Sequence, residues 1–307
     1  MDIESRGFMM TKKEMQQIVH QMLNVYRGIL FHHLKFEEGK HEDFIYKFDC
    51  PEFEELRNRY HLVKIAGNGS DFVRAKRLLH YLAVRLTHSS WYDNHIECNA
   101  LKLLEYSFEQ PEHGINCLNK SKIFVECCLA LGIFARRVTI MPFSPYDFDN
   151  HVVAEIYDRD LEKWIMLDVT TDGYFIDETK TPLSLIEIRE KFASAQFVTY
   201  VPSQSSLKNI KKICTKHAYE NMYMCKNLFY FKAEKYAAFG EKNSYLYFVP
   251  SNYSIKNSKQ ANLEYRIANL PAEQETLRNL AKTNLAQLKQ FHEPERISVE
   301  SMQKKPV

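Results

Sequence analysis

The 307-residue sequence is poor in glycine, with only 9 residues, and none of them forms the cluster of a phosphate-binding loop. No run approaches the ~18 uninterrupted apolar residues that a membrane-spanning helix requires. The first residues, Met1–Arg6, lack the basic start and apolar stretch of a signal peptide. We therefore expect a cytoplasmic protein that has no membrane partner.

An excess of charge of one sign is also absent. Lysine and arginine together number 41 against 39 acidic residues, so the net charge of +2 gives no electrostatic reason to expect a nucleic-acid partner. A hydrophobic content of 45% with 26% charged residues is ordinary for a folded protein. The length allows one large domain with extensions or two modest domains.

The cysteines do not form the pattern of a small disulfide-stabilised protein. There are 7, an odd number, scattered along the chain, which fits a reducing compartment. Cys214 and His217 have a spacing that is found at metal sites, but no second pair accompanies them. The sequence therefore predicts neither a metal nor another cofactor.

The N-terminal third has helical periodicity interrupted by one cluster of turn residues, Gly67–Ser70. We expect residues 1–70 to form a helical extension, in which residues 31–48 are irregular. Thr11 and Glu14 form a candidate capping box at the start of the first helix. The expected helices are 12–28, 51–62, 71–87 and 96–108.

The hydrophobic period changes from helical to alternating after Ala135. Three apolar segments follow in short order and are expected to be adjacent antiparallel strands, at 135–141, 151–157 and 163–169. A helix is expected at 183–193. We place a core domain at residues 71–200.

The C-terminal part is predicted to be a helix and strand extension, 201–307, packed on the core. Two short aromatic strands, 229–232 and 245–249, are expected to extend the same sheet, between helices at 205–225 and 271–291. The polar tail from about residue 293 is expected to be frayed.

Cys117 stands out among the cysteines because of where it lies. Asn116 is a good N-cap residue, so Cys117 would begin a helix, where free amides and the helix dipole favour a thiolate. Its own amide could help to bind an oxyanion. Cys127 and Cys128 fall at packing positions of the same helix. A cysteine at a helix start can equally be structural.

A histidine and an aspartate give the cysteine possible partners. His151 opens one predicted strand and Asp168 ends the next, so antiparallel pairing through the 158–162 turn would place them side by side. Taken singly, such a histidine is often a surface residue and such an aspartate often caps a turn. Together with Cys117 they predict a catalytic triad with a thiol nucleophile.

Four segments carry a resemblance to a known family: Gly114–Ser121, Leu129–Val138, Asn150–Tyr157 and Lys163–Thr170. In order and spacing they resemble the transglutaminase-like superfamily, and the run Asp168–Arg189 looks like that of its uncharacterised bacterial members. The resemblance implies an α+β, papain-like core in which the cysteine helix packs against an antiparallel sheet. Val169 stands where many members have proline, but that proline is not a catalytic group.

The resemblance implies that Cys117 is the nucleophile, His151 the general base and acid, and Asp168 the orienting residue. A thioester formed on a peptide or protein substrate would be resolved by water, as in a peptidase or amidase, or by an amine, as in a transamidase. Gln110 and, second, Trp91 are candidates for a further oxyanion donor; otherwise they are an exposed glutamine and a core tryptophan. An inactive peptide-binding scaffold remains an alternative.

Overall fold

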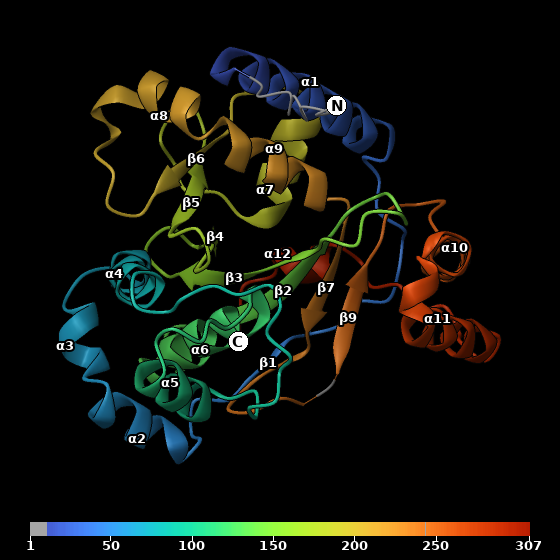
Figure 1. Ribbon diagram of the computed structural model, residues 1–307. Helices are drawn as coiled ribbons and strands as arrows, with labels where there is room; N and C mark the ends of the chain where they lie inside the picture. Colours follow the sequence, from blue (N-terminus) through green and yellow to red (C-terminus); the bar gives the residue numbers. More distant parts are fainter. Residues whose placement is uncertain (1–10, 243) are drawn as a thin grey trace, which may run out of the picture.

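The computed structural model describes residues 11–242 and 244–307. Its centre is a five-stranded sheet with the strand order β4-β3-β2-β7-β9 (Figure 1). Each neighbouring pair in this sheet is antiparallel, which confirms the expected α+β class. The strands are β2 (Ala135–Met141), β3 (His151–Asp158), β4 (Lys163–Leu167), β7 (Tyr230–Glu234) and β9 (Tyr245–Phe248).

Helix α6 (Cys117–Ala130) covers one face of the sheet and is itself enclosed by other helices (Figure 1). Almost all of its side chains are buried, because it packs on β2 and β3 on one side and on helices on the others. Side-chain caps from Ser70, Asn99 and Asn116 start α4, α5 and α6. The surrounding helices are α2 (Glu52–Arg59), α3 (Leu62–Ala66), α4 (Asp71–Ala83) and α5 (Ala100–Glu109).

A second layer lies on the opposite face of the sheet (Figure 1). Val153 points into this second core, whereas its neighbour Ala154 points toward α6, as the alternation of a strand requires. Thr11 and Glu14 form the expected capping box at the start of the first helix. The helices of this layer are α1 (Lys12–His32), α7 (Leu185–Ala193) and α9 (Ala218–Asn227). Helix α8 (Ile210–Lys216) instead packs Ile210 and Ile213 against the core that includes α6.

A small antiparallel sheet pairs β5 (Gly173–Ile176) with β6 (Thr199–Pro202). A Cβ atom on Gly173 would lie 2.3 Å from the ring of Tyr200, so only glycine allows this close approach. Because β5 follows Asp168 directly, the contact helps to fix the turn that carries this carboxylate. Neither strand was expected from the sequence.

The C-terminal region differs most from the prediction. Helix α10 (Ile255–Asn269) was not expected; it buries one residue, Ile255, and so has only a weak apolar stripe. It packs against α11 (Glu275–Leu288), which is shorter than the predicted helix 271–291 (Figure 1). Single 3-10 turns occur at Leu207–Asn209 and Ala272–Gln274.

The expectation of a frayed tail from about residue 293 was wrong. The amide of Ile297 donates to the carbonyl of Tyr247 on β9 over 3.0 Å, and the short helix α12 (Glu300–Gln303) follows. Arg136 donates to the carbonyl of Met302 over 2.6 Å. The tail is held by these backbone bonds and by the buried side chains of Ile297 and Met302, which are too few to give a periodic hydrophobic pattern in the sequence.

The predicted boundary at residue 200 passes through a single sheet, because β7 comes from the C-terminal segment and pairs directly with β2. The N-terminal segment is joined in the same way, since β1 (Ile45–Tyr46) pairs with β8 (Tyr236–Ala237). None of the described helices is long and apolar enough to cross a membrane.

Candidate active site

The segment that leads into α6 is held in place by the connection between α4 and α5. The amide of Ser89 donates to the carbonyl of Ile115 and the amide of Ile115 donates to Thr87, each over 3.1 Å. A Cβ atom on Gly114 would lie 2.8 Å from the backbone of His88. The glycine therefore permits two backbone segments to press together immediately before Cys117.

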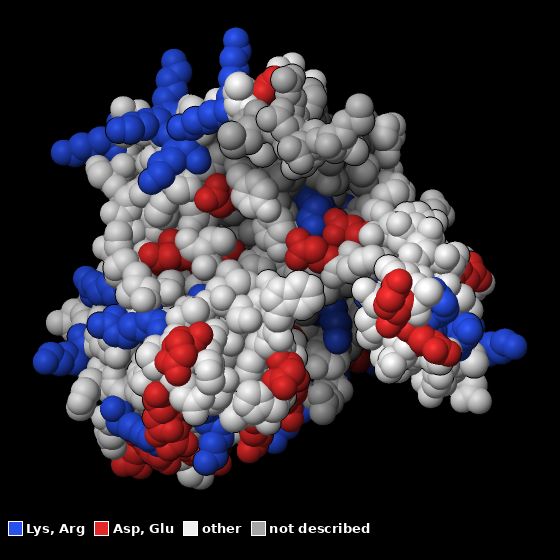
Figure 2. Space-filling view, viewed as in Figure 1, with Lys and Arg blue, Asp and Glu red and all other residues white. Residues whose placement is uncertain are grey.

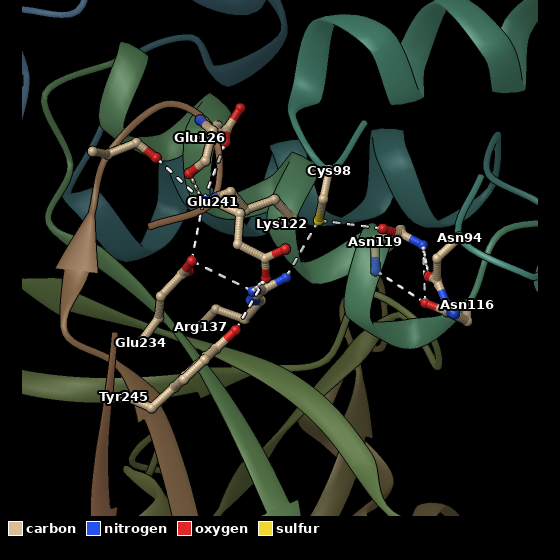
Figure 3. Close-up of polar contacts among 12 residues, drawn as sticks. Asn94, Cys98, Asn116, Asn119, Lys122, Glu126, Arg137, Glu234, Glu241 and Tyr245 are labelled. Atoms are coloured by element: carbon tan, nitrogen blue, oxygen red, sulfur yellow. Dashed lines mark hydrogen bonds and ion pairs between the residues drawn. The ribbon is translucent and has the colours of Figure 1, made fainter. Parts of the chain in front are cut away.

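Amide side chains fix the helix start further (Figure 3). The side chain of Asn116 accepts from the amide of Asn119 over 3.2 Å, the cap expected from the sequence. Asn94 accepts from Asn116 over 3.0 Å and from Asn119 over 2.8 Å. Cys117 is thus the first residue of a helix whose N-terminus is anchored on both sides.

His151 and Asp168 lie together because of the strand register. Ala154 pairs with Leu167, so Asp168 follows the end of β4 beside the start of β3. The Nε2–H group of His151 donates to Oδ2 of Asp168 over 2.8 Å, and both residues are 3% exposed. The carboxylate also accepts from the amide of Thr170 over 2.8 Å and from the hydroxyl of Thr171 over 2.9 Å.

The pKa values of the pair move in opposite directions. Burial alone would raise the pKa of Asp168, but the charge and hydrogen bond of His151, with the bonds from Thr171 and Thr170, hold it below its ordinary value. Burial alone would lower the pKa of His151. The Asp168 carboxylate and a hydrogen bond with the Cys117 side chain outweigh it and raise the pKa to about 10. His151 is therefore an imidazolium at neutral pH.

All three residues line one cavity of about 1220 Å³. Because Nε2 of His151 is bonded to Asp168, Nδ1 is the ring nitrogen left for Cys117. His88, Ser90 and Trp91 form part of the cavity wall. The structure thus brings together the three residues that the sequence singled out, at a surface that solvent can reach.

The two predicted oxyanion donors differ in position. Trp91 lines the cavity but is 95% exposed, so it is not a core tryptophan. Gln110 caps the C-terminal end of α5, is exposed, and does not belong to the described lining of the cavity. A turn closed by the amide of His113 on the carbonyl of Gln110 separates it from α6. No described contact therefore supports Gln110 in that role.

The other cysteines of α6 are packing residues, as predicted. Cys127 and Cys128 are both fully buried, and burial raises the pKa of each thiol. Among the described residues, no group of three or more His, Cys, Asp and Glu side chains is placed to hold a metal ion.

Two residues near the triad were not anticipated, Lys120 and Tyr223. Lys120, one turn after Cys117, is 1% exposed; burial lowers its pKa, against the opposing charges of Asp168, Cys117 and Asp172. The ring of Tyr223 on α9 meets that of His151 edge-on at 5.5 Å. The three-residue spacing from Cys117 could have identified Lys120, whereas only the fold brings Tyr223 to the site.

His88 lies in the polar segment upstream of the cysteine and lines the cavity. Burial lowers its pKa, and the positive charges of Lys120 and His151 act in the same direction. It therefore stands as a neutral imidazole beside a charged one.

Residues 62–169 match the family described as the transglutaminase-like superfamily. The chain contains a transglutaminase-like domain. The match begins at α3 and ends one residue after Asp168, so it includes Cys117 and His151. It supports a cysteine-based enzyme.

A comparison with solved structures finds a proposed cysteine protease from Cytophaga hutchinsonii, which is 17% identical to this chain. The alignment covers 49% of this chain and 47% of the other, with a TM-score of 0.30. Among proteins with curated descriptions, none matches the sequence.

Proposed function

We propose that the transglutaminase-like domain is a cysteine hydrolase that acts on peptide or carboxamide substrates through Cys117, His151 and Asp168. The observation that carries the proposal is the buried His151, which donates to Asp168 and lies with Cys117 in the wall of one open cavity. A raised pKa on His151 beside a thiol favours an imidazolium and thiolate pair.

In the first half of the reaction the Cys117 thiolate attacks the carbonyl carbon of the amide and forms a C–S bond. The carbonyl oxygen becomes an oxyanion, which the free amide at the start of α6 can stabilise. His151 gives its proton to the amide nitrogen, the C–N bond breaks and the amine leaves. A thioester on Cys117 and a neutral His151 remain.

In the second half His151 takes a proton from water, and the oxygen attacks the thioester carbon. The C–S bond breaks, the acid leaves, and thiolate and imidazolium are restored. A primary amine in place of water would give transamidation. Asp168 keeps the histidine ring in one orientation throughout and stabilises its charged form.

Trp91 is the better of the two candidates for a second oxyanion donor because it lines the cavity. Its indole N–H can donate to an oxyanion. A substrate in the cavity would cover the exposed ring and remove it from water. Gln110 would need the segment that follows α5 to rearrange.

The experiment is incubation of the protein with a library of glutamine- and asparagine-containing peptides, with and without a biotinylated primary amine, followed by mass spectrometry. We expect a thioester adduct on Cys117 and hydrolysed or amine-coupled products. Cys117→Ala should abolish both, and Cys214→Ala, which changes a partly exposed cysteine outside the cavity, should leave them intact. Equal behaviour of Cys117→Ala and the wild type would refute the enzyme and favour an inactive peptide-binding scaffold.

A further inference from the structure

The cavity that holds the triad continues along the sheet to a second, basic end. This end is lined by Lys232 on β7 and by Lys259 and Arg266 on α10. Lys232 is half-buried, whereas the two side chains of α10 are exposed to the cavity opening. Figure 2 shows a hollow between the body of the molecule and the α10–α11 pair, with a basic side chain inside it.

These three cations lack acidic partners in the described part of the chain: none forms an ion pair, and their side-chain nitrogens donate no hydrogen bond. They rest instead on aromatic rings. Lys232 lies 3.7 Å from the ring centre of Tyr245, Lys259 lies 4.1 Å from that of Phe291, and Arg266 lies 4.5 Å from that of Phe148. Ring faces hold a cation in place without neutralising its charge.

The nearest acidic residues are engaged by other cations. Glu234 and Glu241 both accept from Arg137, over 3.4 Å and 2.5 Å, as Figure 3 shows. Glu293 pairs with Arg296 over 3.1 Å. The acidic groups that face Lys232 and Lys259 therefore cannot fully compensate them.

The acidic side chains that line the described cavity, apart from Asp168, have partners of their own. Asp149 pairs with Lys226 over 3.1 Å, and Glu220 pairs with His217 over 3.0 Å. At the basic end, burial lowers the pKa of Lys232, and the charges of Arg137 and Lys259 act in the same direction. Like charges thus face one another across a space that is open to a ligand.

We propose that the basic end of the cavity binds a carboxylate of the peptide substrate, with the reacting amide at Cys117. The proposal rests on the proposed function, because it assumes that a peptide occupies the cavity. The carboxylate can belong to a Glu or Asp side chain or to the C-terminus. Either would supply the anion that the three cations lack.

The test measures binding to Cys117→Ala protein, in which no turnover occurs, by fluorescence anisotropy with an uncharged label. The first probe is an N-acetylated, C-terminally amidated peptide with a central glutamine flanked by glutamates. The second has serines in place of the glutamates. The third is the serine peptide with a free C-terminal carboxylate, and a lysine-flanked peptide serves as the opposite-charge probe.

We expect the glutamate peptide, the free-carboxylate peptide or both to bind at least ~5-fold more tightly than the neutral peptide. Which of the two binds identifies the source of the carboxylate. A Lys259→Gln, Arg266→Gln double variant changes only exposed side chains and should remove the preference. Lys232→Met should weaken it, and the control Lys282→Gln, an exposed change on α11 outside this cavity, should not.

Equal binding of the acidic and neutral peptides would overturn the proposal, as would tighter binding of the lysine peptide or a preference that survives in the double variant. Tighter binding of a single-stranded oligonucleotide of the same charge would overturn it too, in favour of a nucleic-acid site. These outcomes are independent of turnover. A protein that shows the preference but forms no thioester keeps the carboxylate site and loses the proposed hydrolase.

Discussion

Two groups of buried charges lie beside α6. One is the pair of His151 and Asp168 near the first turn of the helix. The other is a network farther along it, which joins Lys122 and Glu126 of α6 to Arg137 and Glu234 on the sheet (Figure 3). In both, charged side chains are almost completely removed from water.

The two groups differ in what completes them. In the network, Lys122 donates to the carbonyl of Gly240 over 2.6 Å, and Glu126 accepts from the amides of Ala100 and Gly240 over 2.7 Å and 2.9 Å. Its partners are protein groups, and none of its members lines the triad cavity in the described part of the chain. Buried charge therefore does not by itself mark a functional site.

The triad pair meets a thiol at the wall of a large cavity. Nε2 of His151 is bonded to Asp168, and Nδ1 is left for Cys117. The remaining partner of this pair is therefore a nucleophilic thiol. A buried charge therefore indicates function when one of its sides is open to a cavity. If the triad pair and the network have separate roles, changes in the first should affect the reaction and changes in the second should affect stability.

The largest effect is expected from His151→Asn. It removes the proton carrier, so the rate of thioester formation should fall by at least about 10³-fold. The free energy of unfolding should change by much less than the activation free energy of thioester formation. Single-turnover kinetics and urea unfolding on the same samples measure the two. A variant that unfolds but reacts normally once refolded would place His151 in a structural role.

Arg137→Met tests the network. It leaves Glu241 without its cation and Glu234 with Lys122 alone. Losing one partner of a buried pair destabilises a protein by about 3–5 kcal/mol. Urea unfolding measures the change. Arg59→Met removes the exposed pairs with Glu55 and Glu105 and should cost less than about 1 kcal/mol. If both variants are equally stable, the network contributes nothing.

Much of the site could be predicted because its residues lie on strongly patterned elements. The alternation in β3 and β4, with the short turn between them, fixed the register that joins His151 to Asp168. Asn116 marked the start of α6, and the cap is present. These are local signals that a single sequence contains.

The C-terminal part could not be predicted in the same detail. Helix α10 buries one residue, so it has little periodicity, and the tail after residue 293 is fixed by backbone bonds such as that of Ile297. Lys232, Lys259 and Arg266 come together only through the fold. A contact that depends on distant elements leaves no local pattern to read.

The triad pair and the network should contribute to stability in different pH ranges. The folded-state pKa of His151, about 10, lies above the ordinary 6.5, so its contribution is fully present below pH ~6.5 and lost as the pH rises to about 10. The difference in unfolding free energy between wild type and His151→Gln should therefore shrink by up to about 1.4 kcal/mol per pH unit in that window. A constant difference would mean that His151 is neutral in the folded protein.

Glu126 should act in a lower window. Burial raises its pKa from 4.5 to about 7, against Lys122 and two amides, so the folded protein holds this proton more tightly than the unfolded chain. Its contribution to stability should be present below pH ~4.5 and decline as the pH rises to about 7. Glu126→Gln, compared with wild type by urea unfolding across this range, should remove that decline. An unchanged profile would show a charged Glu126 throughout.

The smallest effect is expected from Gln110→Ala. Its side chain is exposed and does not line the described cavity, so the reaction rate should stay within about 2-fold of wild type and stability within ~0.5 kcal/mol. Trp91→Ala should lower the rate more, while its exposure keeps the effect on stability equally small. Steady-state kinetics of both variants measure the two rates. If Gln110 were the oxyanion donor, Gln110→Ala would lower the rate more than Trp91→Ala.

The most direct measurement is the alkylation rate of each cysteine by iodoacetamide in the native protein at pH 6, followed by peptide mass spectrometry. Cys50 and Cys214, which are also partly exposed, serve as internal references. We expect Cys117 to react at least ~10-fold faster than either, and His151→Asn to lower its rate to theirs. Equal rates for the three cysteines in the wild type, or a Cys117 rate unchanged by His151→Asn, would contradict this expectation.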